Sequence, residues 1–150
     1  MDELDRKILR ILQEQPDISV VELAQQVGLS HTPCWRRVKQ LEAAGAIQSH
    51  AIILDPKIMG FGISVFAHVR LKAHDEETLE RLEQAARDCM QIVDCYSMGG
   101  ESDYLFRIVV HSIEDYERFL KKTLLHFPGV ASIQSHFALK CVKSTTKLPI

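Results

Sequence analysis

The sequence predicts an α+β protein in which three helices precede a repeated pattern of strands and helices. Apolar residues recur at helical spacing as far as residue 45. From residue 63 onwards, segments in which they alternate, as they do in strands, are interspersed with segments of helical spacing. Between the two patterns lies a segment rich in proline and glycine, residues 55–62. We therefore predict an N-terminal domain at 1–54, a linker at 55–62 and a C-terminal domain at 63–150.

The first 45 residues carry the start and stop signals of three helices. The first helix has a single apolar stripe, formed by Leu4, Ile8, Ile11 and Leu12. Ser19 and Glu22 have the spacing of a capping box, in which each side chain bonds to an unpaired amide where the second helix begins. Gly28 then allows a sharp turn, and Ser30 can cap a third helix that ends at Gly45. Two helices joined by a short glycine turn predict a helix-turn-helix.

The third predicted helix has a basic outer face, with three basic residues and no carboxylate between Ser30 and Leu41. Helical spacing places Thr32, Arg36, Lys39 and Gln40 opposite an apolar stripe of Cys34, Val38 and Leu41. Arginine and lysine can bind phosphates or guanine, and glutamine can read adenine. A solvated surface helix is the alternative. The residues expected to contact DNA are Ser30, His31, Thr32, Pro33, Trp35, Arg36, Arg37, Lys39 and Gln40.

The segment that follows the third helix predicts a strand. Residues 46–54 are rich in isoleucine and end at Asp55 and Pro56. A strand beside three helices would be the wing of a winged helix-turn-helix.

The second half repeats one order of elements, βαββαβ, which is typical of a ferredoxin-like fold. The expected elements are a strand from Ile63 to Leu71, a helix capped by Asp75, strands at Ile92–Met98 and Tyr104–Val110, a helix capped by Ser112, and a last strand at Val130–Val142. Right-handed crossovers put both helices on one face of such a sheet. Because Leu105 and Val109 make the other face apolar too, we expect a homodimer, which would suit a pseudo-palindromic duplex.

Composition narrows the class of protein. The formal net charge is -2, and the longest apolar run, Ala51 to Leu54, is far shorter than the roughly 18 residues that a membrane span needs. The acidic start of the chain differs from a secretory signal, so we expect a cytoplasmic protein. The four cysteines contain no Cys-x-x-Cys pair, and we expect buried thiols rather than disulfides.

Enzymatic and metal-dependent functions are the alternatives to ligand-responsive DNA binding. No nucleophile elbow, P-loop or zinc-protease motif is present, so we expect neither catalysis nor a cofactor. The alternative to a ligand-responsive regulator is a metal- or redox-responsive one that uses Cys34 and His31. Cys34 also belongs to the apolar stripe of its helix, where a free cysteine behaves as a small buried hydrophobe.

Three stretches of the chain resemble the Lrp/AsnC family, the feast/famine regulators. They begin "LDRKILRILQEQPDISVVELAQQVGLSHTPCWRR", "GGESDYLFRI" and "HFPGVASIQSHF", in the order of the family. The resemblance implies a sequence-specific transcriptional regulator with a winged helix-turn-helix and a βαββαβ domain of the RAM type. It also implies dimers that often assemble into octamers, and amino-acid effectors bound between dimers. The segment "TPCWRR" is similar to a subgroup that includes regulators responding to sulfur amino acids.

The same resemblance implies an effector site at the turn before the third strand. The Gly-x-x-Asp-Tyr pattern of the family falls on Gly100, Asp103 and Tyr104. Exposed amides there can bind a carboxylate, and Asp103 can hold an ammonium group. A plain hairpin turn is the alternative. The expected effector-binding residues are Met98, Gly100, Glu101, Asp103 and Tyr104, followed by Gln134, Ser135 and His136 on the last strand.

Overall fold

The computed structural model describes all 150 residues, which divide into two compact units. We call the first unit the head; it comprises residues 1–53 together with 143–150. We call the second unit the sheet domain; it comprises residues 54–142. The first change of unit lies one residue from the predicted end of the N-terminal domain. The linker segment 55–62 groups with the sheet domain, and the last eight residues group with the head instead of the domain predicted at 63–150.

The head contains the three predicted helices, α1 (Glu3–Glu14), α2 (Val20–Val27) and α3 (His31–Ala43). The capping box at the start of α2 is confirmed, because Ser19 Oγ accepts from the Glu22 amide at 3.2 Å while the Ser19 amide donates to the Glu22 carboxylate at 3.1 Å. Ser30 occupies the cap position of α3 but makes no capping bond with its side chain. The core of the head is built on the fully buried Ile8, Leu23 and Cys34.

The predicted wing strand at 46–54 is wrong. No residue between 46 and 54 belongs to a strand, and Ile52 is 88% exposed. Only Ile47 of this segment packs against the core of the head. A strand needs a partner for its backbone amides and carbonyls, and the four strands of this chain all pair within the sheet domain. The isoleucine-rich composition therefore indicated a strand, but no segment of the chain pairs with residues 46–54 in the structure.

The end of the chain binds α1 through backbone groups. The side-chain amide of Gln13 both donates to the Leu148 carbonyl at 3.2 Å and accepts from the Leu148 amide at 2.6 Å. Arg10 Nε donates to the Ile150 carbonyl at 2.9 Å. These bonds give an extended segment partners that a neighbouring strand would otherwise provide. They explain why residues 143–150 group with the head.

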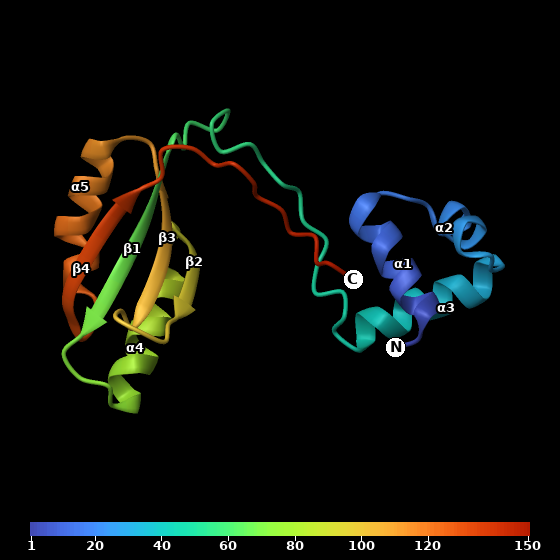
Figure 1. Cartoon of the computed structure of the whole chain (residues 1–150), viewed down its shortest axis with the longest axis horizontal. Helices are drawn as coiled ribbons and strands as arrows, with labels where there is room; N and C mark the ends of the chain where they lie inside the picture. Colours follow the sequence, from blue (N-terminus) through green and yellow to red (C-terminus); the bar gives the residue numbers. More distant parts are fainter. The chain divides into compact units, whose positions relative to one another are not determined.

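The sheet domain confirms the predicted βαββαβ order. Its elements are β1 (Ile63–Leu71), α4 (Glu76–Asp88), β2 (Ile92–Ser97), β3 (Tyr104–Val110), α5 (Ile113–Lys122), a 3-10 turn (Leu124–His126) and β4 (Val130–Phe137). The sheet has the order β2-β3-β1-β4, and every neighbouring pair is antiparallel (Figure 1). Asp75 and Ser112 cap α4 and α5 as predicted, by accepting from the amides of Thr78 and Asp115.

The last strand ends five residues earlier than predicted, at Phe137 instead of Val142. Its partner explains the difference. Because β1 begins at Ile63, the bond from the Ala138 amide to the Ser64 carbonyl is the last one available between the two segments. An alternating pattern that runs past the end of the partner strand does not extend a ladder.

The core of the sheet domain lies between the sheet and the helices α4 and α5. Every second residue of β1 and β3 is buried on this side, including Val65, Val69 and Phe106, and Leu82 of α4 is equally inaccessible. The opposite face, which we call the open face, carries Phe66 and Leu105, both half-buried, and Tyr96, which is 57% exposed. The prediction of one helix-covered face is confirmed.

The cysteines are all free, but their burial differs from the prediction. Cys34 is buried, Cys89 is half-buried, and Cys95 and Cys141 are exposed. None of the helices combines the length and the apolar character that crossing a membrane requires.

Candidate DNA-binding helix and effector pocket

The outer face of α3 presents the predicted polar stripe to solvent. Thr32, Arg36, Lys39 and Gln40 are all exposed, whereas Cys34 and Leu41 on the opposite side are buried. Arg36 forms no ion pair within the chain, and Lys39 Nζ lies 2.7 Å from a carboxylate oxygen of Glu42. Ser30, His31, Pro33 and Trp35 are exposed as well, with Trp35 at 47%. The helix therefore has free hydrogen-bond donors on the side that faces away from the core, as insertion into a major groove requires.

Arg37 differs from the other predicted DNA contacts. Its guanidinium bonds to Asp5 at 2.6 Å and to Asp2 at 2.8 Å, at the beginning of α1. These two bonds raise the pKa of the Arg37 guanidinium. The Asp5 amide, followed by Arg37, lowers the pKa of Asp2. Arg37 thus joins α3 to α1, and its charge is already paired within the head.

The two residues of the metal alternative lie in different environments. Cys34 is fully buried, and burial raises the pKa of its thiol, which disfavours the thiolate that a metal would need. His31 is exposed at the start of the same helix. In the whole chain, no three His, Cys, Asp or Glu side chains are grouped so that they could hold a metal ion.

Asp103 fixes the turn between β2 and β3 to the end of β1. Its carboxylate accepts from the Leu71 amide at 2.7 Å and lies 2.8 Å from Nε2 of His74. The Leu71 bond, followed by the one to His74, lowers the pKa of the Asp103 carboxyl. Gly100, in the same turn, has a φ of +124°, which an L side chain rarely adopts. The structure therefore gives Asp103 the role of shaping the turn.

A cavity of about 260 Å³, which we call the turn pocket, lies beside this turn on the open face. Its lining consists of three predicted residues, Glu101, Gln134 and His136, and four others, His68, Arg70, Ser102 and Ser132. Arg70 Nε donates to the Glu101 carbonyl at 2.5 Å. Nδ1 of His68 lies 3.2 Å from Ser102 Oγ, and the His68 and His136 rings meet edge to face at 5.2 Å. The pocket thus combines a guanidinium, a carboxylate and two imidazoles.

Two predicted effector residues face the helices instead. The Tyr104 hydroxyl donates to Glu83 of α4 at 2.8 Å, and Ser135 Oγ lies 2.5 Å from the hydroxyl of Tyr116 on α5. Strand alternation explains this, because Tyr104 shares a face with Phe106, and Ser135 lies between Gln134 and His136 on β4. Met98 and Gly100 lie in the turn without lining the pocket.

Two residues of the pocket lining, His68 and Arg70, were not among the expected effector-binding residues, although the same alternation marks their position. His68 and Arg70 alternate with the buried positions of β1, so they lie on the open face. The register of β1 with β4 then pairs His68 with Gln134 and Arg70 with Ser132. The alignment of β1 with β4 depends on pairing between distant segments, so the local sequence pattern could not predict it.

The environment of the Tyr104 hydroxyl predicts that this phenol titrates at higher pH than a free tyrosine. Burial, followed by the bond to Glu83, raises the pKa of Tyr104 to about 12. Because folding favours the neutral phenol, this contribution to stability is complete below the ordinary pKa of 10.0 and is lost as the pH rises through about 12. We expect phenolate absorbance to show a step near the upper value that Tyr104→Phe removes and Glu83→Gln moves to lower pH. An unchanged titration in both variants would contradict the assignment.

The comparisons with known proteins match both units. Residues 1–48 fit the family model described as "Winged helix-turn-helix DNA-binding", and residues 64–148 fit the model described as "Lrp/AsnC ligand binding domain". The Bkd operon transcriptional regulator of Pseudomonas aeruginosa is 41% identical over 150 residues, covering 100% of this chain and 98% of that protein.

Two solved structures resemble the whole chain. An AsnC family transcriptional regulator from Agrobacterium tumefaciens has a TM-score of 0.93 at 41% identity, over 99% of this chain and 97% of that one. A transcriptional regulator from Neisseria meningitidis in complex with L-Met has a TM-score of 0.93 at 36% identity, over 99% and 96%.

A helix-turn-helix head joined to a ligand-binding sheet domain defines a DNA-binding transcriptional regulator and not an enzyme. Both the head and the sheet domain match in order, and the relatives cover the chain from end to end. The chain belongs to the Lrp/AsnC family.

Proposed function

We propose that this regulator binds an amino acid in the turn pocket and that the bound amino acid changes how α3 engages duplex DNA. The observation that carries the proposal is the meeting of Arg70, Glu101 and His136 in one pocket beside the turn. A relative of 36% identity has been solved in complex with L-Met, which supports an amino acid as the class of ligand.

The chemistry of the turn pocket suits a zwitterion. Arg70 uses Nε in a bond to the Glu101 carbonyl, which leaves its terminal nitrogens to bind a carboxylate. The Glu101 carboxylate can accept from an ammonium group, and Gln134 offers both a donor and an acceptor. The cavity of about 260 Å³ lies at the small end of ligand sites, which favours a single amino acid over a larger effector.

We further propose that two copies of the chain associate through the open face. Phe66, Leu105 and Tyr96 leave apolar surface there that no segment of the sheet domain covers. A two-fold dimer would present two α3 helices to the halves of a pseudo-palindromic operator. Assembly of such dimers into an octamer is the larger form that we expect. Regulation of this kind places the protein with the chromosome, in the cytoplasm.

Arg70→Ala tests the turn pocket. We expect basal duplex binding to remain, and the L-methionine concentration that changes it to rise at least about tenfold, because a charge-assisted hydrogen bond is lost. L-leucine and L-cysteine are tested in the same way. The measurement is fluorescence anisotropy of a labelled operator, titrated with each amino acid.

Lys72→Ala is the matched control, since Lys72 follows β1, is exposed, and does not line the pocket. Asp103→Ala should act in the same direction as Arg70→Ala, because the turn loses its acceptor for the Leu71 amide. If the amino acid changes duplex binding by Arg70→Ala as strongly as by the wild type, the effector does not bind in the turn pocket.

A further inference from the structure

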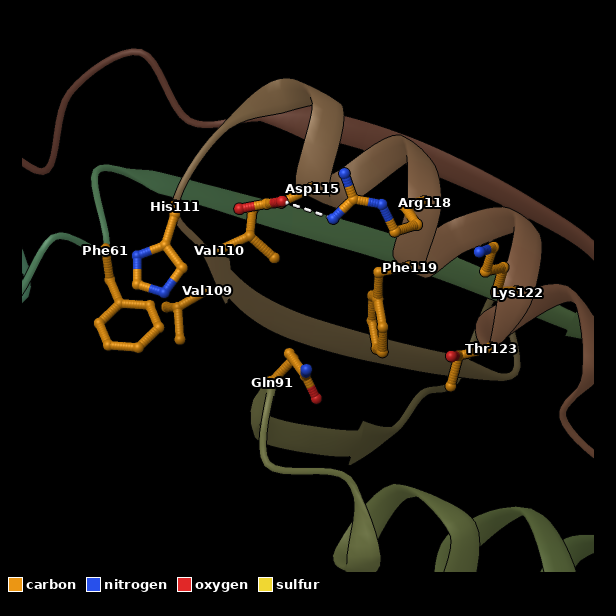
Figure 2. A pocket seen from close by; sticks show the side chains of 10 residues that line it. All are labelled: Phe61, Gln91, Val109, Val110, His111, Asp115, Arg118, Phe119, Lys122 and Thr123. Atoms are coloured by element: carbon orange, nitrogen blue, oxygen red, sulfur yellow. Dashed lines mark hydrogen bonds and ion pairs between the residues drawn. The ribbon is translucent and has the colours of Figure 1, made fainter.

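The sheet domain contains a second cavity, which shares no lining residue with the turn pocket. It has a volume of about 370 Å³ and lies between the end of β3, the helix α5 and the segment that precedes β1. We call it the linker pocket. Figure 2 shows Phe61 and His111 on one side of it, Lys122 and Thr123 on the other, and Gln91 below.

One wall of the linker pocket is made by the folded end of the linker. The Asp55 carboxylate accepts from the Lys57 amide at 2.8 Å, and the Phe61 amide donates to the Pro56 carbonyl at 2.7 Å. The Phe61 ring stacks on His111, with ring centroids 4.3 Å apart and planes 24° apart (Figure 2).

Gly60 contacts His111 and so helps to fix the position of the linker beside the pocket. Nδ1 of His111 lies 2.9 Å from the Gly60 carbonyl, and a side-chain carbon at position 60 would lie 3.3 Å from the same nitrogen. Gly60 also has a φ of +84°, which an L side chain rarely adopts. The linker is therefore held against the sheet domain by contacts that a ligand in the pocket would touch directly.

The charges around the linker pocket favour an anion with an apolar body. Phe61 and Phe119 supply aromatic surface. Arg118 bonds to Asp115 at 3.0 Å, which neutralises the single carboxylate of the lining. Lys122 has no carboxylate partner in the chain, whereas the neighbouring Lys121 is bonded to Glu117 at 2.6 Å. The Lys122 ammonium is thus an unpaired cation beside the aromatic side chains. This combination suits an aromatic ligand with a carboxylate group.

We propose that the linker pocket binds a small aromatic monocarboxylic acid, with its carboxylate on Lys122 and its ring against Phe61 and Phe119. Such a ligand touches the linker, so it stabilises the folded turn at residues 55–62. Any effect on DNA rests on the proposed function, but binding in this pocket does not.

The test uses phenylacetate as the probe and the full chain as the protein. By isothermal titration calorimetry, we expect wild-type protein to bind phenylacetate, and to bind uncharged phenylacetamide at least about tenfold more weakly. Lys122→Gln should weaken phenylacetate binding by a similar factor. Lys121→Gln, its neighbour outside the pocket, and Arg70→Ala, in the turn pocket, should leave the affinity unchanged. No binding to the wild type, or a loss in Arg70→Ala but not in Lys122→Gln, would overturn the proposal.

The linker contact has its own readout. Lys57 is exposed within the turn that the pocket anchors, so trypsin can cut after it when the turn opens. We expect saturating phenylacetate to slow this cleavage severalfold, as followed on denaturing gels, in wild-type protein and not in Lys122→Gln. Bound phenylacetate with an unchanged cleavage rate would overturn the effect on the linker. Neither measurement uses DNA, so their failure leaves the proposed function of the turn pocket untouched.

Discussion

Arg36→Ala is expected to weaken duplex binding by about fivefold to 150-fold at each half-site, since one specific arginine contact is worth about 1–3 kcal/mol. Arg36 is exposed at the centre of the basic stripe and has no ion pair to break, so its removal should not unfold α3. Arg37, in contrast, is bonded to Asp2 and Asp5, and its replacement would mix a structural effect with a binding effect.

A salt series separates the possible roles of Arg36. If its guanidinium binds a phosphate, the slope of log affinity against log salt becomes shallower by about 1 in Arg36→Ala, equally for all sequences. If it reads a base, the slope stays and discrimination between operator and random duplex is lost. Arg81→Ala is the matched control, because Arg81 is also exposed and unpaired but lies on α4 of the sheet domain. An Arg36→Ala protein with unchanged affinity for duplex DNA would contradict the assignment of α3 as the helix that contacts the bases.

Phe106→Ala should destabilise the sheet domain by about 3–5 kcal/mol, the usual cost of truncating a buried phenylalanine. Phe106 is fully buried in the middle of β3, and its ring has two aromatic neighbours, Tyr104 and Phe127, with centroids 6.4 and 6.2 Å away. A loss of this size is a large part of the stability of a small domain.

The aromatic residues allow the two units to be followed separately. Trp35 is the only tryptophan and belongs to the head, whereas Tyr96, Tyr104 and Tyr116 all belong to the sheet domain. In urea, we expect Phe106→Ala to lower the midpoint of the tyrosine transition and to leave the tryptophan transition in place. Phe137→Ala is the control, because Phe137 is 43% exposed and leaves a smaller cavity. Equal shifts of both transitions would show that the units unfold together.

The elements that the sequence predicted well are those specified locally. The starts of α1, α2 and α4 depend on side chains such as Ser19 and Asp75, which bond to amides three residues away. Burial that alternates along β1 and β3 follows from the period of two in the sequence. The same locality made the outer face of α3 predictable residue by residue.

The errors concern features that depend on distant parts of the chain. The predicted wing at 46–54 has the composition of a strand but no partner, and β4 ends where β1 does. The effector site stays a prediction, for which the family pattern in the turn pointed to Tyr104 and the last strand to Ser135. Side-chain direction sends both toward the helices, and the pairing of β1 with β4 brings in His68 and Arg70 instead.

The bonds between Gln13 and Leu148 mean that the polypeptide passes from the head into the sheet domain and later comes back. The chain therefore crosses between the head and the sheet domain twice, once before β1 and once after β4. A nick after Lys57 breaks only the first of these connections. Residues 1–57 of the nicked molecule, including α3, would then be held to the rest of the chain by noncovalent contacts such as the hydrogen bonds of Arg10 and Gln13 to Ile150 and Leu148.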